Sequence, residues 1–399
     1  MSDITTTAEP PSAQPEATRY LAHERFHRRF VLPATADHPE LQVSYADVGR
    51  LPPPPPKEPE VTSTSSDSHP TILFIPGMFA SRYLSVWMHP IAEKVGVRVL
   101  VVDRPGMGHS TNVPLDQRLN VWIELVPALL AHMQIRQVSL VSHSAGTIYL
   151  LNTLSRCRDM LHPENPLAVL VAPWVDPFHS RVTTMLMLQS LPSSLFGMYH
   201  HIPKLINTGG RAFGRLADMF PASSGSGLIA GGVPSDSDPA RRNRQKLETE
   251  YDLSVAVQQE LQVLVQKSMF GESLDGADSE ALFCLRKGPD GLWGECDNYA
   301  DAARKLVDLE RSRQNNRDPG VVGKGKKRGL TVHAYFADTD AMIGKKGQTY
   351  FENCWNGGHG YKFDDVVEFR STTVKDTDHD SVVLSVEVLE RIFLLAKEA

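Results

Sequence analysis

A chain of 399 residues of which 41% are apolar can bury a sizeable core, and its 28 glycines and 28 prolines imply substantial loop structure. Its 41 lysines and arginines are outnumbered by 47 aspartates and glutamates, so the formal charge of −6 excludes a basic footprint for nucleic acid. The 4 scattered cysteines exclude a disulfide framework and favour a reducing, cytoplasmic setting, and no stretch approaches the roughly 18 apolar residues of a membrane span.

Two segments near the N-terminus lack the pattern of a folded element. Residues 1–18 are rich in Thr, Pro, Ala and Glu without apolar periodicity, which is typical of a disordered tail. The Pro-rich loop at 51–70 contains a run of five prolines that favours an extended spacer. We interpret this loop as a surface insertion, and a ligand for a proline-binding protein is the alternative.

Short apolar runs then predict the strands of a sheet. Leu41, Val43 and Tyr45 alternate with polar neighbours, so the stretch from Arg25 to Gly49 is expected to form a hairpin. Further apolar runs, separated by amphipathic helical patterns, indicate a parallel sheet with crossover helices. They lie at 72–75, 97–102, 138–141 and 168–171, and a helical pattern containing Pro127 spans 119–133.

From residue 177 to 329 this rhythm is lost over a stretch far longer than an ordinary connection, which predicts an inserted cap. Its first part could cover a hydrophobic cleft or simply pack on the core, because it is dense in apolar residues: Met185, Leu186, Met187, Leu188, Leu191, Leu195, Phe196 and Met198. Further on, Ser223 to Pro239 has loop composition. The basic segment Gly323 to Gly329 lacks P-loop spacing and is expected to be a solvated loop.

The sheet is predicted to resume after the cap, with strands at 330–336 and 366–374 and a closing helix from Ser381. Residues 19–176 and 330–399 would then form one core interrupted by the cap at 177–329. The predicted class is α/β, with a mostly parallel twisted sheet and helices on both of its faces.

The segment VSLVSHSAGTIYLL carries the strongest chemical signal, because an apolar strand runs directly through Ser144 into a helical pattern. A sharp turn there forces the central serine into a strained conformation, so the residues two positions away must be small. Ser142 and Gly146 meet this requirement. Ser144 would stand above the sheet beside a helix N-terminus, where amide donors stabilise an oxyanion.

With this elbow, the chain resembles the α/β-hydrolase superfamily. The segment Ile75-Pro76-Gly77-Met78-Phe79 looks like the family's oxyanion loop, and Asp103-Arg104-Pro105-Gly106-Met107-Gly108-His109-Ser110 is similar to its loop after the fourth strand. The resemblance implies that amides of Ala145 and of Met78 or Phe79 form the oxyanion hole. His143 and Gly77 are expected to line or support the substrate site.

The resemblance also implies a base and an acid after later strands. His379, in Asp378-His379-Asp380, follows the last predicted strand, and its flanking aspartates are expected to raise its pKa. His359 precedes that strand and is expected to be a surface turn residue. Asp340 fits the position of the acid best, with Asp338 and then Asp176 as alternatives.

These residues predict a serine hydrolase that acts on an ester, thioester or amide of a hydrophobic small molecule, without a metal or an organic cofactor. A serine at the elbow disfavours the dehalogenases and epoxide hydrolases of the superfamily, which need a carboxylate there. Two alternatives keep the fold: an acyltransferase or lyase that uses the same triad, and a non-catalytic binding protein.

Overall fold

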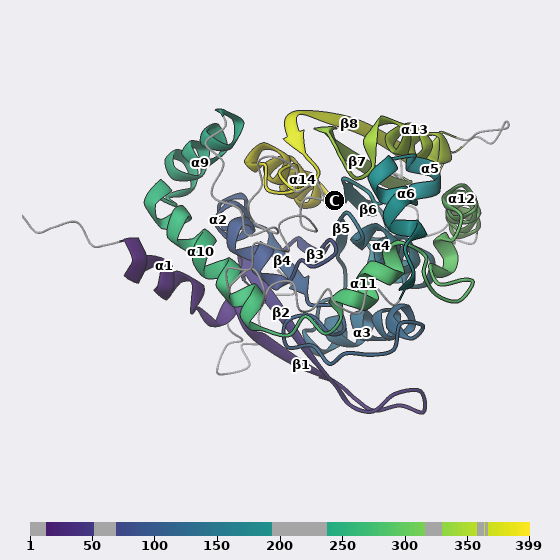
Figure 1. The fold of residues 1–399 in the computed structure, drawn as a ribbon, viewed down its shortest axis with the longest axis horizontal. Helices are drawn as coiled ribbons and strands as arrows, with labels where there is room; N and C mark the ends of the chain where they lie inside the picture. Colours follow the sequence, from purple (N-terminus) through teal and green to yellow (C-terminus); the bar gives the residue numbers. More distant parts are fainter. Residues whose placement is uncertain (1–12, 52–68, 194–237, 316–328, 357–362, 364–365) are drawn as a thin grey trace, which may run out of the picture.

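A single eight-stranded sheet runs through the centre of the computed structural model (Figure 1), in the order β1-β2-β4-β3-β5-β6-β7-β8. β1 and β2 form the predicted antiparallel hairpin, β2 pairs antiparallel with β4, and every other pairing is parallel. The strands are β1 (Arg28–Leu32), β2 (Leu41–Gly49), β3 (Thr71–Ile75), β4 (Arg98–Val102), β5 (Ser139–His143), β6 (Leu167–Val171), β7 (Leu330–Thr339) and β8 (Val367–Asp378). The prediction of a mostly parallel sheet is confirmed.

The structure describes residues 13–51, 69–193, 238–315, 329–356, 363 and 366–399. The Pro-rich loop, nearly all of the loops predicted at 223–239 and 323–329, and His359 lie outside the described residues. So do Leu195, Phe196 and Met198 of the apolar stretch predicted in the cap.

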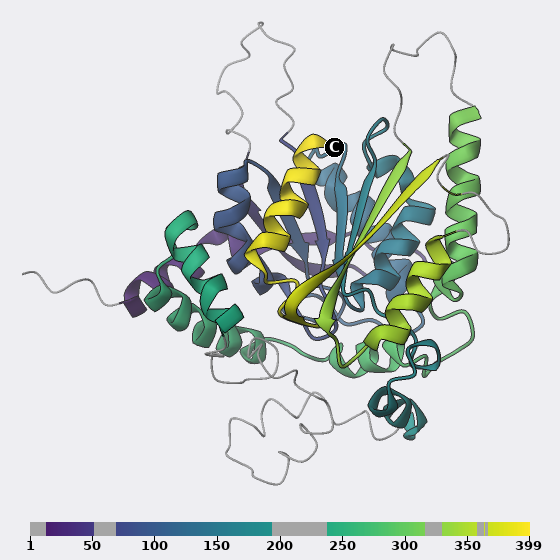
Figure 2. The same cartoon turned by 90° about the horizontal axis from the view of Figure 1, so that it is seen from above.

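Helices cover both faces of the sheet (Figure 2), which confirms the predicted fold class. On one face α2 (Ser85–Val95) packs against α14 (Val386–Glu398). On the other face α4 contacts both α3 and α12, and α12 contacts α13. These helices span α3 (Arg118–His132), α4 (Gly146–Arg156), α12 (Tyr299–Asn315) and α13 (Gly344–Trp355). β3, β5 and β6 are buried along their whole length, as expected for central parallel strands that helices cover on both faces.

Two predicted boundaries near the chain ends are wrong. The expected tail at 1–18 overlaps helix α1 (Ala13–Leu21), which buries Ala17 and Leu21 and packs against α10 (Val255–Gly271). The closing helix begins at Val386 instead of Ser381, because Asp378 accepts the amide hydrogens of Asp380 and Ser381 and holds that segment in a turn.

The segment predicted as a cap divides into two parts. α12 packs on α4 and α13, so it belongs to the helical layer of the core, which corrects the cap boundary at 329. The preceding elements lie along the edge where the parallel strands end (Figure 2). They are α5 (Pro177–Ser180), α6 (Thr183–Ser190), α9 (Asp238–Tyr251), α10 and α11 (Ala277–Cys284). In α6, Met185 and Leu188 are buried and Met187 is exposed.

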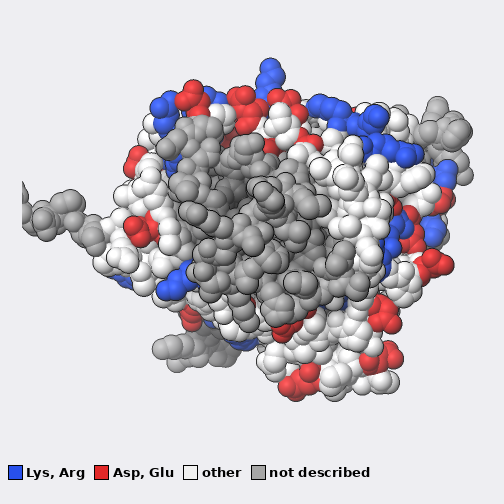
Figure 3. All heavy atoms as spheres, in the orientation of Figure 1, with Lys and Arg blue, Asp and Glu red and all other residues white. Residues whose placement is uncertain are grey.

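Short 3-10 turns complete the described chain at Glu24–Phe26, Arg82–Leu84, Arg158–Met160 and Gly294–Cys296. All 4 cysteines are free thiols. Among the described helices, none has the length and apolar character needed to cross a membrane. Basic and acidic side chains are interspersed around the rim of the face in Figure 3, with Lys and Arg gathered over α13.

Candidate active site

Ser144 lies in the predicted elbow, directly after the end of β5 and before the start of α4. Ser144 has a left-handed φ of 49°, and its amide donates to the carbonyl of Val171 at 3.0 Å, which fixes the turn against β6. A Cβ on Gly146 would lie 2.4 Å from the Ile75 carbonyl oxygen and 2.8 Å from that of Pro76. The helix α4 can therefore start against β3 only with glycine at this position.

Three side chains from the ends of β5, β7 and β8 converge at this elbow. Nε2 of His379 lies 2.7 Å from Oγ of Ser144, and Nδ1 lies 2.8 Å from Oδ2 of Asp340. The other oxygen of Asp340 accepts the amide hydrogens of Met342 at 2.8 Å and Ile343 at 2.9 Å. The structure thus brings the predicted nucleophile, base and acid together in one hydrogen-bonded series.

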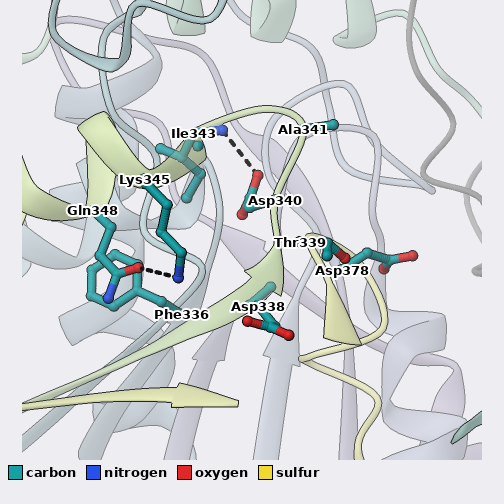
Figure 4. A pocket seen from close by; sticks show the side chains of 11 residues that line it. Phe336, Asp338, Thr339, Asp340, Ala341, Ile343, Lys345, Gln348 and Asp378 are labelled. Atoms are coloured by element: carbon teal, nitrogen blue, oxygen red, sulfur yellow. Dashed lines mark hydrogen bonds between the residues drawn. The ribbon is translucent and has the colours of Figure 1, made fainter. Parts of the chain in front are cut away.

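The alternative acids lie elsewhere. Asp338 is exposed, and Figure 4 shows it further back along β7, whereas the Asp340 carboxylate points toward the start of α13. Asp176 lies 2.6 Å from Nε of Arg286 and caps α5 by accepting the amide hydrogen of Phe178 at 2.8 Å. Among the candidates, only Asp340 contacts the imidazole of His379.

The surroundings of the base and the acid set their charges. Burial alone would lower the pKa of His379, but the Asp340 carboxylate raises it, and Asp380 and Asp378 contribute, so the pKa lies above its ordinary 6.5. Burial alone would raise the pKa of Asp340, but His379 and the two loop amides hold it below its ordinary 3.8. Asp340 is therefore ionised wherever His379 can act as a base, and the flanking aspartates act as the sequence predicts.

His143 is buried behind the site, where it supports the base. Its Nε2 donates to the backbone carbonyl of His379 at 2.8 Å, and burial together with His379 lowers its pKa to about 3, so it is neutral. Its Nδ1 has no hydrogen-bond partner among the residues that the structure describes. A Cβ on Gly77 would lie 2.7 Å from this nitrogen and 3.1 Å from Cβ of Ser144. Two roles were predicted for His143, lining the substrate site or supporting it. Its burial and its hydrogen bond to His379 fit the supporting role.

The oxyanion loop, residues 75–79, brings its backbone beside the elbow. Its turn is closed by the amide of Ala80, which donates to the Gly77 carbonyl at 3.1 Å, and Phe79 has a left-handed φ of 63°. Ala145 is the N-cap of α4. The amides of Met78 and Ala145 donate to no other residue in the described part of the chain. Both residues are among the three, Met78, Phe79 and Ala145, whose amides are predicted as oxyanion donors.

Sequence reasoning missed the side chains that brace this loop. Arg104 is buried and donates to the carbonyls of Pro76 and Gly77, and its guanidinium lies 2.9 Å from the carboxylate of Glu280 on α11. The motif that contains Arg104 signals a structural loop, but nothing local in the sequence identifies Glu280 as its partner.

A cavity of about 390 Å³ lies beside the acid loop (Figure 4). Its lining includes Asp338, Asp340, Lys345, Gln348 and Asp378. Neither Ser144 nor His379 lines this cavity, so it borders the acid without opening onto the nucleophile.

Comparisons with known proteins identify the family and the fold of the chain. The model of the alpha/beta hydrolase family matches residues 72–361, and no curated protein matches the chain. An epoxide hydrolase from Vigna radiata is 12% identical over 95% of this chain and 100% of its own, with a TM-score of 0.51. A mutant Vigna radiata epoxide hydrolase is 15% identical over 94% and 100%, with a TM-score of 0.51. A thermophilic esterase from Thermogutta terrifontis is 12% identical over 93% and 97%, with a TM-score of 0.46. Because their sequences are only 12% and 15% identical to this chain, the likeness to the two epoxide hydrolases shows a common fold alone.

Proposed function

This chain belongs to the alpha/beta hydrolase family, and from that premise we propose that it is a serine hydrolase of hydrophobic small-molecule esters, thioesters or amides. The observation that carries the proposal is the series from Ser144 through His379 to Asp340, with contacts of 2.7 and 2.8 Å. A serine becomes an effective nucleophile when an oriented base can take its proton, and this series supplies that base.

In the first half of the reaction, Oγ of Ser144 attacks the carbonyl carbon while Nε2 of His379 takes the hydroxyl proton. Asp340 holds the imidazole in the tautomer that leaves Nε2 free to accept, and its charge stabilises the imidazolium that forms. His379 then donates the proton to the leaving alcohol, thiol or amine, which leaves an acyl group on Ser144.

The negative charge that develops on the carbonyl oxygen needs donors placed in advance. The amides of Ala145 and Met78 supply them, and the N-terminal end of α4 adds the positive end of its dipole. In the second half, water activated by His379 attacks the acyl group, and collapse of that adduct releases the acid and regenerates Ser144.

The identity of the nucleophile separates this proposal from epoxide opening. Epoxide hydrolases form an ester with a carboxylate at the elbow, and here the elbow residue is Ser144. An acyl-serine intermediate therefore fits this site better than a carboxylate ester.

The test is labelling of the purified protein with a fluorophosphonate probe, together with a panel of short, long and aromatic esters. Ser144→Ala is the diagnostic variant, and Ser139→Ala, in the same strand, is the matched control. Labelling and ester turnover that are lost only in Ser144→Ala would support the proposal. Labelling without turnover of any ester would favour acyl transfer or lyase chemistry on the same triad. A well-folded wild type that resists the probe would overturn it in favour of a binding protein.

A further inference from the structure

A buried ion cluster links the inserted segment to the oxyanion loop. It consists of Arg104, Arg118, Tyr149 and Glu280, and all four side chains are buried. We propose that Arg104, held in place by Glu280 of α11, is a positioning residue for the oxyanion hole. The inference rests on the proposed function, because an oxyanion hole matters only if an oxyanion forms.

Arg104 acts on the two peptide groups that lead to the oxyanion donor. It donates to the carbonyl of Pro76 and, at 2.7 Å, to that of Gly77. The Gly77 carbonyl and the Met78 amide belong to one planar trans peptide group, so they point in opposite directions. A guanidinium that holds the carbonyl on one side of this group therefore aims the Met78 N–H to the other side. Polarisation of the same peptide group by the positive charge strengthens the amide as a donor.

Glu280 determines where Arg104 can sit. Its Oε2 lies 2.9 Å from Nη2 of Arg104, and its Oε1 lies 2.5 Å from Nη2 of Arg118 and accepts the Tyr149 hydroxyl at 2.8 Å. Burial alone would raise the pKa of Glu280, but the two guanidiniums hold it below its ordinary 4.5 and keep the carboxylate charged. Without that charge, two buried cations would face each other.

Backbone contacts fix the segment that carries Glu280. The amide of Gly276 donates to the carbonyl of Gly106 at 2.9 Å, and Gly108 and Ser273 exchange hydrogen bonds of 3.0 and 3.1 Å. A Cβ on Gly276 would lie 2.4 Å from the Pro105 carbonyl oxygen, so the two chains meet without room for a side chain. The inserted segment thus positions Glu280, Glu280 positions Arg104, and Arg104 aims the donor of the oxyanion loop.

Arg118 provides a matched control for Arg104. Both guanidiniums are buried and pair with Glu280, but Arg104 donates to the carbonyls of the oxyanion loop, whereas Arg118 donates to the Pro105 carbonyl at 2.8 Å. Arg104→Gln and Arg118→Gln each remove one positive charge and each leave one ion pair. A purely structural role of the cluster would make the two variants equivalent.

The first experiment compares these variants in ester hydrolysis and in binding of a boronic acid, whose tetrahedral adduct places an oxygen in the oxyanion hole. Arg104→Gln should lower kcat about 10- to 100-fold, with KM within about threefold, and should weaken boronic acid binding in proportion. In Arg118→Gln, kcat, KM and the affinity for the boronic acid should each stay within about threefold of the wild-type value. Arg104→Lys, which keeps the charge, should recover part of kcat. Equal losses in Arg104→Gln and Arg118→Gln would overturn the inference.

The second experiment tests Glu280 without changing the net charge of the cluster. The double variant Arg118→Met with Glu280→Gln leaves Arg104 alone and keeps the net charge of the cluster at that of two arginines and one glutamate. Its kcat should fall below that of Arg118→Met alone, and the same value in both would exclude a role for Glu280.

Hydrogen exchange of the peptide that covers the oxyanion loop gives a readout independent of activity. Exchange should accelerate in Arg104→Gln relative to Arg118→Gln, and equal rates would contradict the bracing of the loop. A wild type that neither labels nor turns over esters would instead overturn the proposed function, while the exchange comparison would still decide whether Arg104 braces the loop.

Discussion

At the residue scale, the neighbours of an ionisable side chain decide its role. Asp338 and Asp340 stand two positions apart in the sequence, yet one is exposed and the other is hydrogen-bonded to His379 and to two backbone amides. The sequence pattern favoured Asp340 through the family resemblance, but it could not supply the amide contacts. Those contacts depend on how the loop enters α13.

The base makes a testable claim about pH. Because only the neutral imidazole can take the Ser144 proton, kcat/KM should rise as pH increases through the pKa of His379. The carboxylates around His379 raise that pKa above 6.5, since they stabilise the imidazolium. Asp380→Asn removes one of these charges, so the midpoint of the pH profile should move to lower pH.

A pH profile of kcat/KM for an ester substrate measures this shift. Asp376→Asn is the control, because Asp376 is exposed, pairs with Arg242 at 3.0 Å, and is not among the groups that raise the pKa of His379. A midpoint that stays in place in Asp380→Asn, or that moves equally in Asp376→Asn, would contradict the electrostatic account.

At the scale of elements, the elbow depends on the close approach of α4 to β3. Gly146→Ala places a methyl group 2.4 Å from the Ile75 carbonyl oxygen, which belongs to the backbone and cannot rotate away. We expect the variant to lose about 1–3 kcal/mol of unfolding free energy and most of the ester turnover proposed for the wild type, because the shift displaces Ser144. Thermal unfolding followed by circular dichroism, alongside kcat, measures both effects.

Gly271→Ala is the control, because nothing lies within 4 Å of the position that its Cβ would take at the end of α10. Its melting temperature should equal or exceed that of the wild type, since alanine reduces the entropy of the unfolded chain. If Gly146→Ala were as stable and as active as Gly271→Ala, the steric explanation of the elbow would be wrong.

Elements defined by local apolar patterns could be predicted, and elements defined by their partners could not. The strands β3 to β6 follow from short apolar runs, and the elbow follows from the small residues around Ser144. In contrast, α1 is short and polar and is recognisable by its packing on α10. The helical spacing of Ala302, Ala303, Leu306 and Val307 indicates that α12 is a helix with one buried face, but its place in the core depends on its contacts with α4 and α13.

At the scale of the whole molecule, buried ion pairs join segments that are far apart in the sequence. Glu280 reaches Arg104 and Arg118, Glu272 reaches Arg82 at 2.6 Å, and Glu310 reaches Arg158. No periodic pattern marks such a pairing, because it depends on the folded arrangement. The triad could be anticipated because the family resemblance orders its segments, but no resemblance identified the acidic partners of these arginines.

The pair that joins α12 to the core carries the last prediction. Glu310 and Arg158 are both buried, with oxygens 2.5 and 3.1 Å from the guanidinium nitrogens. One turn further, Arg313 pairs with Asp159 at 2.7 Å on the surface, where the Asp159 side chain is 90% exposed. Glu310→Gln should therefore cost about 3 kcal/mol or more of unfolding free energy, because it leaves a buried cation uncompensated. Arg313→Gln should cost less than about 1 kcal/mol.

Urea unfolding of both variants measures these costs, and kcat/KM should stay near the wild-type value in each, since none of the four side chains contacts the triad. We expect Glu310→Gln to unfold in a single transition at a lower urea concentration than the wild type. If the dependence of its unfolding free energy on urea concentration is unchanged, the same surface is exposed in that transition, so α12 unfolds together with the sheet. Two outcomes would contradict this assignment: a separate early transition in Glu310→Gln, or a cost no larger than that of Arg313→Gln. α12 would then belong to an independently stable insert, as the predicted cap at 177–329 implies.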